Sequence, residues 1–168
     1  MSTPDGASEL YQGLRKGGVD FAVHIPDSVL SGVSARLEAD AAVETLVCAR
    51  EDEGIAIATG AYLAGRLPVA IMEGSGIGYS ALILARAQIQ RTPVLLLVGH
   101  SLVLGERFDF HGATRMASAG VLSGLGIPHL LVDAADKAAL YAEQAAITAT
   151  GQKTCVALII PPYLTART

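Results

Sequence analysis

Residues 50–62 read Arg50-Glu51-Asp52-Glu53-Gly54-Ile55-Ala56-Ile57-Ala58-Thr59-Gly60-Ala61-Tyr62, three consecutive carboxylates followed by apolar and small residues. The apolar run continues to Gly65 without a polar stripe, and a helix of this kind is normally enclosed in a core or an interface. Carboxylates at a helix start favour the positive end of the helix dipole, which is one explanation for the acidic run. The other explanation is that one of the three carboxylates points inward and has a catalytic role. The residues alone leave both explanations open.

Strand and helix patterns alternate on both sides of this segment. The repeated alternation predicts an α/β fold with a six-stranded, mostly parallel sheet and helices on both faces. We expect the whole chain, residues 1–168, to form one domain. The predicted strands are 19–25, 43–48, 67–72, 93–98, 129–132 and 154–160, and the predicted helices are 7–16, 29–37, 51–65, 74–90, a helix ending at 124, and an Ala-rich helix between the last two strands.

The composition narrows the class of protein. Hydrophobic residues make up 51% of the chain and charged residues only 17%, which indicates apolar surface that a partner covers. A net charge of −4 without a basic cluster argues against nucleic acid as a partner. No apolar run approaches the roughly 20 residues that cross a bilayer, so no membrane association is expected. The N-terminal residues lack the features of a signal peptide, and Cys48 and Cys155 stand in apolar segments, so we expect a cytoplasmic protein with two reduced core thiols.

In a parallel sheet, ligands meet the loops at the carboxyl ends of the strands. One such loop reads Gly74-Ser75-Gly76-Ile77-Gly78, in which the glycines alternate. It matches neither the dinucleotide-binding pattern nor the Walker A pattern. Two interpretations stay open: a tight strand-to-helix turn, or a backbone that passes close to a flat ring or a neighbouring subunit.

Further candidates lie at the same expected edge. His24 ends the first predicted strand, and His100, Arg107, His111 and Arg115 lie in or beside a polar, irregular segment after the fourth. Polar loops of this length in compact domains tend to be either active-site covers or disordered segments. Each residue taken singly has a structural or surface explanation. No His or Cys spacing suggests a metal site, and no nucleophile elbow is present.

Several motifs carry a family resemblance that covers nearly the whole chain. Residues 19–30 include His24-Ile25-Pro26-Asp27-Ser28, residues 50–65 end in Gly-Ala-Tyr-Leu-Ala-Gly, and residues 72–78 end in Ser-Gly-Ile-Gly. With the aliphatic strand at 92–99 and Gly-Leu-Gly-Ile-Pro at 124–128, they resemble the pyrimidine-binding domain of thiamine diphosphate enzymes. More narrowly, the chain resembles the free-standing alpha subunit of sulfopyruvate decarboxylase and the matching half of phosphonopyruvate decarboxylase.

The resemblance implies thiamine diphosphate as cofactor and a carboxylate that activates its pyrimidine ring. Counted back ten positions from Tyr62, the family glutamate falls on Asp52, which is one methylene shorter. Glu51 or Glu53 could take the role instead, and neighbours on a helix point about 100° apart, so all three cannot reach one ring. Pro26 and the glycine segment, Gly74, Ser75, Gly76, Ile77 and Gly78, are the other cofactor-binding candidates.

The same resemblance implies a partner. The family holds the diphosphate and Mg²⁺ in a separate domain with a Gly-Asp-Gly start, and this chain contains no such pattern. We therefore predict the alpha subunit of a split 2-oxo acid decarboxylase, paired with a beta subunit that carries Mg²⁺ in a hetero-oligomer (alpha2beta2 or larger). The alternatives are a non-catalytic stabilising or regulatory subunit, and a carboligase or other lyase on the same scaffold.

The substrate expectation is a short 2-oxo acid with an anionic tail. Arg107 or Arg115 would bind the tail, because an arginine fork suits tetrahedral oxyanions. His24 or His111 would lie near the reacting carbon and handle a proton. The chain departs from the family around the glycine segment, where Glu73-Gly74 and Tyr79-Ser80 stand in places at which related enzymes tend to carry amides.

Overall fold

A computed structural model describes residues 5–100 and 107–165, and it contains one six-stranded sheet in the order β2-β1-β3-β4-β6-β5. Every neighbouring pair is parallel, so the predicted sheet is confirmed and is parallel throughout. Its central strands are buried on both faces, which explains their continuous aliphatic sequences. The strands are β1 (Phe21–His24), β2 (Glu44–Val47), β3 (Pro68–Glu73), β4 (Leu95–Gly99), β5 (His129–Leu131) and β6 (Val156–Ile160).

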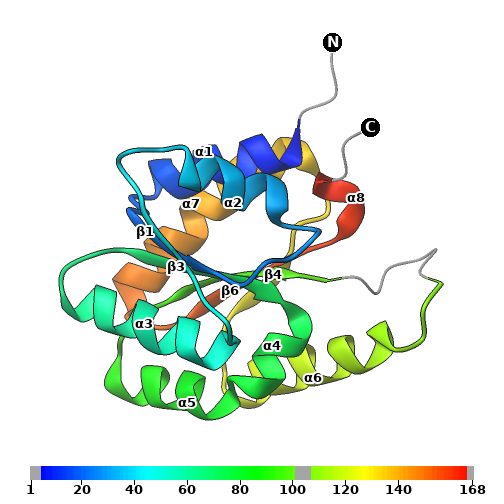
Figure 1. Cartoon of the computed structure of the whole chain (residues 1–168). Coiled ribbons are helices and arrows are strands. Elements are labelled where there is room, and N and C mark those ends of the chain that lie inside the picture. Colours follow the sequence, from blue (N-terminus) through cyan, green and yellow to red (C-terminus); the bar gives the residue numbers. More distant parts are fainter. Residues whose placement is uncertain (1–4, 101–106, 166–168) are drawn as a thin grey trace.

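Helices cover both faces of the sheet, as the alternation predicted (Figure 1). Side chains on β4 alternate between the two: Leu95 and Leu97 join one hydrophobic cluster, and Leu96 and Val98 join the other. The first cluster lies under α1 (Gly6–Lys16), α2 (Ser31–Glu38), α7 (Ala135–Gln152) and α8 (Pro162–Thr165). The second lies under α3 (Glu51–Leu63), α4 (Gly74–Tyr79), α5 (Ala81–Gln90) and α6 (His111–Gly124).

The structure differs from the prediction at two helices. The predicted helix 74–90 is divided at Ser80, whose N–H bonds to Gly76 O at 3.0 Å and ends α4. The carbonyl of Ser80 then accepts a bond from Leu84 N at 2.9 Å and begins α5, so the two helices share one cap residue. The short helix α8 was not predicted, because four residues are too few to show a period.

The remaining expectations concern membranes and thiols. In the part of the chain that the structure describes, no helix combines the length and apolarity needed to cross a bilayer. Cys48 and Cys155 are buried free thiols, as predicted. Burial raises the pKa of the Cys155 thiol to about 11, which makes it a poor nucleophile.

Candidate functional site

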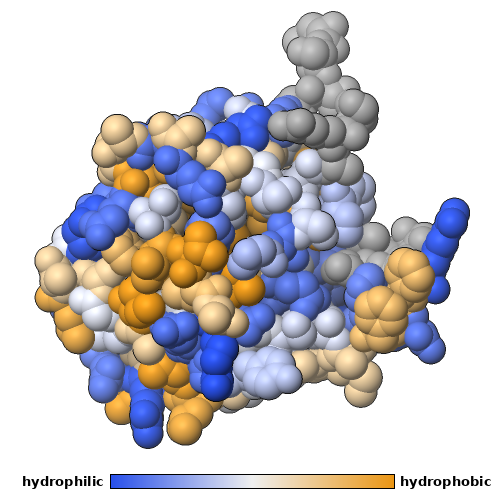
Figure 2. Space-filling model, viewed as in Figure 1, coloured by the Kyte–Doolittle hydropathy of each residue, from blue (hydrophilic) through white to orange (hydrophobic). Residues whose placement is uncertain are grey.

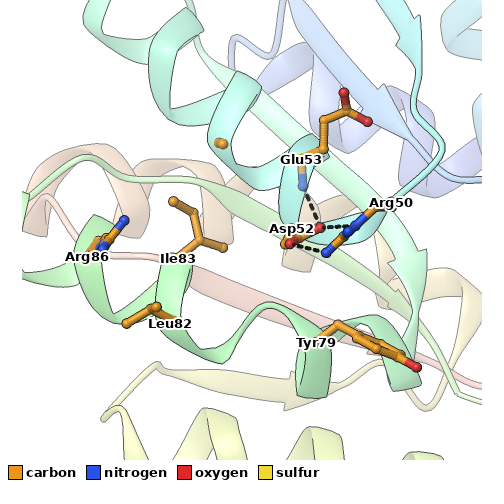
Figure 3. A pocket seen from close by; sticks show the side chains of 8 residues that line it. Arg50, Asp52, Glu53, Tyr79, Leu82, Ile83 and Arg86 are labelled. Carbon is orange, nitrogen blue, oxygen red and sulfur yellow. Dashed lines mark hydrogen bonds and ion pairs between the residues drawn. The ribbon is translucent and has the colours of Figure 1, made fainter.

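The three carboxylates at the start of α3 lie in three different environments. Glu51 packs against Gly76 of α4, where an added Cβ would lie 2.9 Å from both Cβ and Cδ of Glu51. Asp52 pairs with Arg50, which donates from Nε to Oδ1 at 3.0 Å and from Nη2 to Oδ2 at 2.8 Å (Figure 3). Glu53 is exposed, and its carboxylate points away from Asp52 in Figure 3. The helix therefore separates the three groups, as its 100° turn per residue requires.

A cavity of about 590 Å³ lies between the start of α3 and the α4–α5 segment (Figure 3). Two carboxylates, Asp52 and Glu53, line it from α3. The hydrogen bonds from Arg50 lower the pKa of Asp52, so this carboxylate is ionised at neutral pH. The cavity thus combines a fixed anion with an apolar wall. Its lining residues are Arg50, Asp52, Glu53, Ala56, Tyr79, Leu82, Ile83 and Arg86.

Large apolar side chains on α3, α4 and α5 are uncovered, and two of them, Tyr79 and Leu82, line this cavity. The four residues that we call the α3–α5 surface are between 67% and 84% exposed: Leu63, Tyr79, Leu82 and Ile89. Helix α3 was predicted to be enclosed, but only one of its faces is buried in this chain. Exposed apolar surface of this kind marks interaction sites, so the second face of α3 is available to a partner.

The alternating glycines have a packing role inside the chain. An added Cβ at Gly74 would lie 2.8 Å from Cγ2 of Thr114 on α6, and one at Gly76 would meet Glu51 on α3. Gly78 lies against Ala117 of α6 in the same way, with 3.1 Å to its Cβ. The glycine segment is therefore the start of α4, held between α3 and α6, rather than an open loop. Its contact with a cofactor stays a prediction.

His24 and Pro26 line a second cavity, of about 480 Å³, on the α2 side of β1. The imidazole of His24 is buried, and its Nε2 lies 2.9 Å from Oε1 of Glu38 without hydrogen-bond geometry. The other polar groups around the cavity include Asp27 and hydroxyls of α2 and the turn before it, from Ser28, Ser31 and Ser34. Pro26 and Asp52 thus line different cavities in this chain.

The other predicted substrate residues belong to α6 and the segment before it. His111 is the first residue of α6, with its ring centroid 4.4 Å from that of Phe110 and 5.9 Å from that of Phe108. Arg115 is exposed on α6, and Arg107 precedes the helix. Helices α2 and α6 cover opposite faces of the sheet (Figure 1). His24 lines the cavity beside α2, so it and the α6 residues belong to different faces. Their joint role stays a prediction.

Three titratable residues that were not assigned roles together lie at or just after the ends of β1, β3 and β4. An added Cβ at Gly99 would lie 2.7 Å from Oδ1 of Asp27, so the carboxyl of Asp27 lies on Gly99. Glu73 is the register partner of Gly99, and His100 follows it. Sequence reasoning named these loops as the expected site, but register and burial were needed to join the three residues.

These features define a class: an α/β chain with a fixed carboxylate in a cavity that borders uncovered apolar surface. Residues 4–119 match the family of the thiamine pyrophosphate enzyme, N-terminal TPP binding domain. The chain belongs to this family, and the predicted resemblance is confirmed.

The similarity to curated relatives and to a solved structure agrees with this family membership. The chain is 32% identical to sulfopyruvate decarboxylase subunit alpha of Methanothermobacter thermautotrophicus over 74% of this chain and 76% of that protein. It is 31% identical to the same subunit of Methanococcus maripaludis over 79% of this chain and 80% of that protein. Phosphonopyruvate decarboxylase of Streptomyces viridochromogenes is 38% identical over 44% of this chain and 18% of that protein. A 2-oxoglutarate:ferredoxin oxidoreductase from Magnetococcus marinus shares the fold, with a TM-score of 0.76 over 96% of this chain and 29% of that chain at 17% identity.

The residues fit one end of the cofactor that the family name implies. A cavity with a carboxylate and an apolar wall suits a flat, nitrogen-containing ring such as the pyrimidine. The diphosphate end needs a metal, and residues 5–100 and 107–165 contain no group of three or more His, Cys, Asp or Glu that could hold one.

Proposed function

We propose that this chain is the pyrimidine-binding subunit of a thiamine diphosphate-dependent 2-oxo acid decarboxylase that works with a second subunit. The observation that carries the proposal is the fixed carboxylate of Asp52 in a cavity beside the uncovered α3–α5 surface. An active site divided between two chains has this form. The similarity to sulfopyruvate decarboxylase alpha subunits over about three quarters of both chains supports it.

In this proposal Asp52 contacts the pyrimidine ring. The two hydrogen bonds from Arg50 keep the carboxylate ionised and limit its rotation. The side chain would therefore stay oriented toward the ring although it is shorter than glutamate. Leu82 and Ile83 supply the apolar wall that excludes water from the ring. The cofactor, when bound, supplies the electron sink for loss of carbon dioxide.

The second subunit would bind the diphosphate and Mg²⁺ and would cover the α3–α5 surface. Burial of Leu63, Tyr79, Leu82 and Ile89 would provide the apolar core that stable interfaces need. We propose a hetero-oligomer, alpha2beta2 or larger. Its beta chain would be recognised by a Gly-Asp-Gly sequence.

For the substrate we propose a short 2-oxo acid with an anionic tail, bound by Arg115 or Arg107 at the α6 side of the sheet edge. Replacing the arginine that binds the tail with Met should raise KM steeply for the anionic substrate and much less for pyruvate, because only the former loses a charge-assisted bond. Assay of the reconstituted pair against a panel of 2-oxo acids tests this. Equal activity on a bulky, uncharged 2-oxo acid would exclude the anionic pocket.

A non-catalytic, stabilising role is the second candidate, and one observation favours it. By the count from Tyr62, Asp52 takes the place of the family's glutamate, and both of its carboxylate oxygens accept hydrogen bonds from Arg50. If neither Asp52→Asn nor the matching amide changes at Glu51 and Glu53 alter turnover of the reconstituted pair, the stabilising role holds and the catalytic one fails.

A further inference from the structure

Strand β5 forms an open edge of the sheet. Its neighbour on one side is β6, and it is the last strand in the order β2-β1-β3-β4-β6-β5. All three of its residues are exposed, and two of them are leucines, Leu130 at 47% and Leu131 at 48%. The backbone of Ala134 is still extended, with φ −145° and ψ 134°, so the strand direction continues toward α7. An open edge of this kind can pair with another strand.

The register with β6 decides which backbone groups of β5 are left over. Bonds to β6 come from the carbonyl of Pro128 and from the N–H of Val132, each at 2.9 Å. In a parallel ladder this pattern turns both backbone groups of Leu130 toward β6 as well. The N–H and C=O of His129 and Leu131 therefore point to the open side. Within residues 5–100 and 107–165 they have no hydrogen-bond partner.

A second copy of the same edge can satisfy these groups, running antiparallel about a two-fold axis. When Leu131 lies opposite Leu131 of the second copy, the two residues exchange both N–H···O=C bonds. This register also places His129 opposite Asp133 of the second copy, at both ends of the contact. An imidazole and a carboxylate attract each other, whereas a register centred on Asp133 would put two carboxylates face to face. The side chain of Asp133 is 59% exposed, and its pairing with Lys137 is loose, at 3.9 Å.

The opposite edge of the sheet is less suited to such pairing. Strand β2 contains Glu44, which pairs with Arg66 at 3.0 Å, and a charged residue on an edge strand opposes pairing. Strand β5 contains no Asp, Glu, Lys or Arg. It is also separated by β4 and β6 from β1 and β3, on which α3 packs. The β5 edge thus stays free when a beta subunit covers the α3–α5 surface.

We propose that the β5 edge binds a second copy of this chain, antiparallel and with Leu131 at the two-fold axis, so that the two sheets become one. The inference goes beyond the proposed function, because this contact needs neither the cofactor nor a beta subunit. In a hetero-oligomer with two alpha chains, the paired β5 strands join them.

Sedimentation velocity of the full chain alone, at concentrations up to about millimolar, the weak end of specific association, tests the contact. We expect a dimer whose fraction grows with concentration. Leu131→Lys places two ammonium groups opposite each other and should weaken this dimer by about tenfold or more. Leu46→Lys on β2 is the matched control at a position 43% exposed, and it should leave the dimer unchanged. Both variants should unfold at the wild-type temperature, since neither position is buried.

A charge exchange tests the register. On an extended chain His129 and Asp133 are about 13 Å apart, so they cannot pair within one copy. His129→Asp puts two carboxylates opposite each other at both ends of the contact and should weaken the dimer by about tenfold or more. Adding Asp133→Lys to that variant should restore it. A double variant as weak as His129→Asp alone would overturn the proposed pairing.

Amide hydrogen exchange of the wild-type chain decides the matter if a variant does not fold. The N–H groups of His129 and Leu131 should exchange fast in dilute solution and slowly at high concentration, whereas that of Leu130 should be protected in both. A chain that is monomeric at every concentration overturns the proposal. So does a dimer that is lost in Leu82→Asp and kept in Leu131→Lys, because it forms through the α3–α5 surface. None of these measurements involves decarboxylation, so failure of this contact and failure of the proposed function are seen separately.

Discussion

At the scale of residues, the central group is Asp52. A misplacement of about 1 Å in an active site can cost on the order of 100-fold in rate, and aspartate is one methylene shorter than the family's glutamate. The pair of hydrogen bonds from Arg50 restricts where its carboxylate can lie. In the proposed site Arg50 therefore acts together with Asp52, and the acidic run alone did not reveal this pair.

Asp52→Asn should lower cofactor-dependent turnover of the reconstituted pair by about 100-fold or more, because the amide keeps the shape and removes the charge. The exchange rate of the cofactor's reactive C–H proton, followed by NMR, checks the same step directly. Glu53→Gln is the matched control on the same helix turn and should be milder. Full turnover of Asp52→Asn would refute the assignment.

Asp40 provides a pH prediction away from the site. Its pKa is lowered by hydrogen bonds from Ala42 N–H and the Tyr11 hydroxyl and by Arg15, whose Nε lies 2.8 Å from Oδ2, against the opposing effect of burial. A carboxyl with a lowered folded-state pKa adds stability that is complete above its unfolded value of about 4 and is lost as pH falls through the folded value. Denaturant titrations from about pH 5 to 2 should therefore show a shallower acid loss in Asp40→Asn than in the wild type. Parallel slopes for both proteins would contradict this.

Part of the candidate site was predictable because it follows from chain direction. The carboxyl ends of parallel strands share one edge, so the loops containing His24, Asp52, Glu73 and His100 could be named in advance. Which of these groups lie close together could not be predicted, because that depends on the strand register and on which helix covers which face of the sheet. The separation of Pro26 from Asp52, and the contact of Asp27 with Gly99, are results of that kind.

At the scale of elements, glycines set how closely helices approach. An added Cβ at Gly13 of α1 would lie 2.8 Å from Cα and C of Ala139 on α7, and closer still to its carbonyl oxygen. These are backbone atoms that cannot rotate away, so α1 and α7 pack through their main chains at this point. Gly74 and Gly76 bring α4 close to α6 and α3 in a different way, because an added Cβ there would meet the side chains of Thr114 and Glu51.

Gly13→Ala should destabilise the fold by about 1–3 kcal/mol or more, because overpacking must push α1 from α7. Chemical denaturation measures the change. Gly120→Ala is the control: it is also inside a helix but has nothing within 4 Å of an added Cβ. It should instead stabilise by about 0.5–1 kcal/mol, the usual gain of alanine over glycine. Equal effects of the two variants would show that α1 and α7 are not in backbone contact.

Most elements were predictable from sequence because they have a clear period or a clear end. β3 and β4 read as aliphatic runs bounded by turns, and α3 begins at its acidic residues. The division between α4 and α5 at Ser80 could not be predicted, because Ser80 is neither glycine nor proline. It is set by the hydrogen bonds that the Ser80 N–H and carbonyl make to the two helices. The exposed face of α3 was also hidden, because sequence indicates that a helix will be covered without saying by which chain.

At the scale of the whole molecule, uncovered apolar surface lies on more than one side. Figure 2 shows apolar residues gathered over the edge strand β2, where Leu46 and Val47 are 43% and 59% exposed. The α3–α5 surface is more exposed and borders the Asp52 cavity. This agrees with the low charged fraction of 17%. Exposed apolar surface of this kind is typical of interaction sites.

Leu82→Asp should weaken association with the beta subunit by about tenfold or more, because it buries a charge in an apolar interface. Leu82 is 67% exposed, so the isolated variant should unfold at the wild-type temperature. Ile147→Asp on α7, at a position 51% exposed on the opposite face, should leave association unchanged. Light scattering of the mixed subunits gives the result. Equal loss in both variants would place the interface elsewhere.

The central claim is that this chain is half of a thiamine diphosphate site, and calorimetry of cofactor binding tests it most directly. Thiamine diphosphate with Mg²⁺ is titrated into the chain alone and into the chain mixed with a beta subunit that carries the Gly-Asp-Gly sequence. The account predicts weak or no binding to the chain alone and tight, Mg²⁺-dependent binding to the mixture. Binding to the isolated chain at about micromolar Kd or tighter, a free energy near −8 kcal/mol, would contradict it.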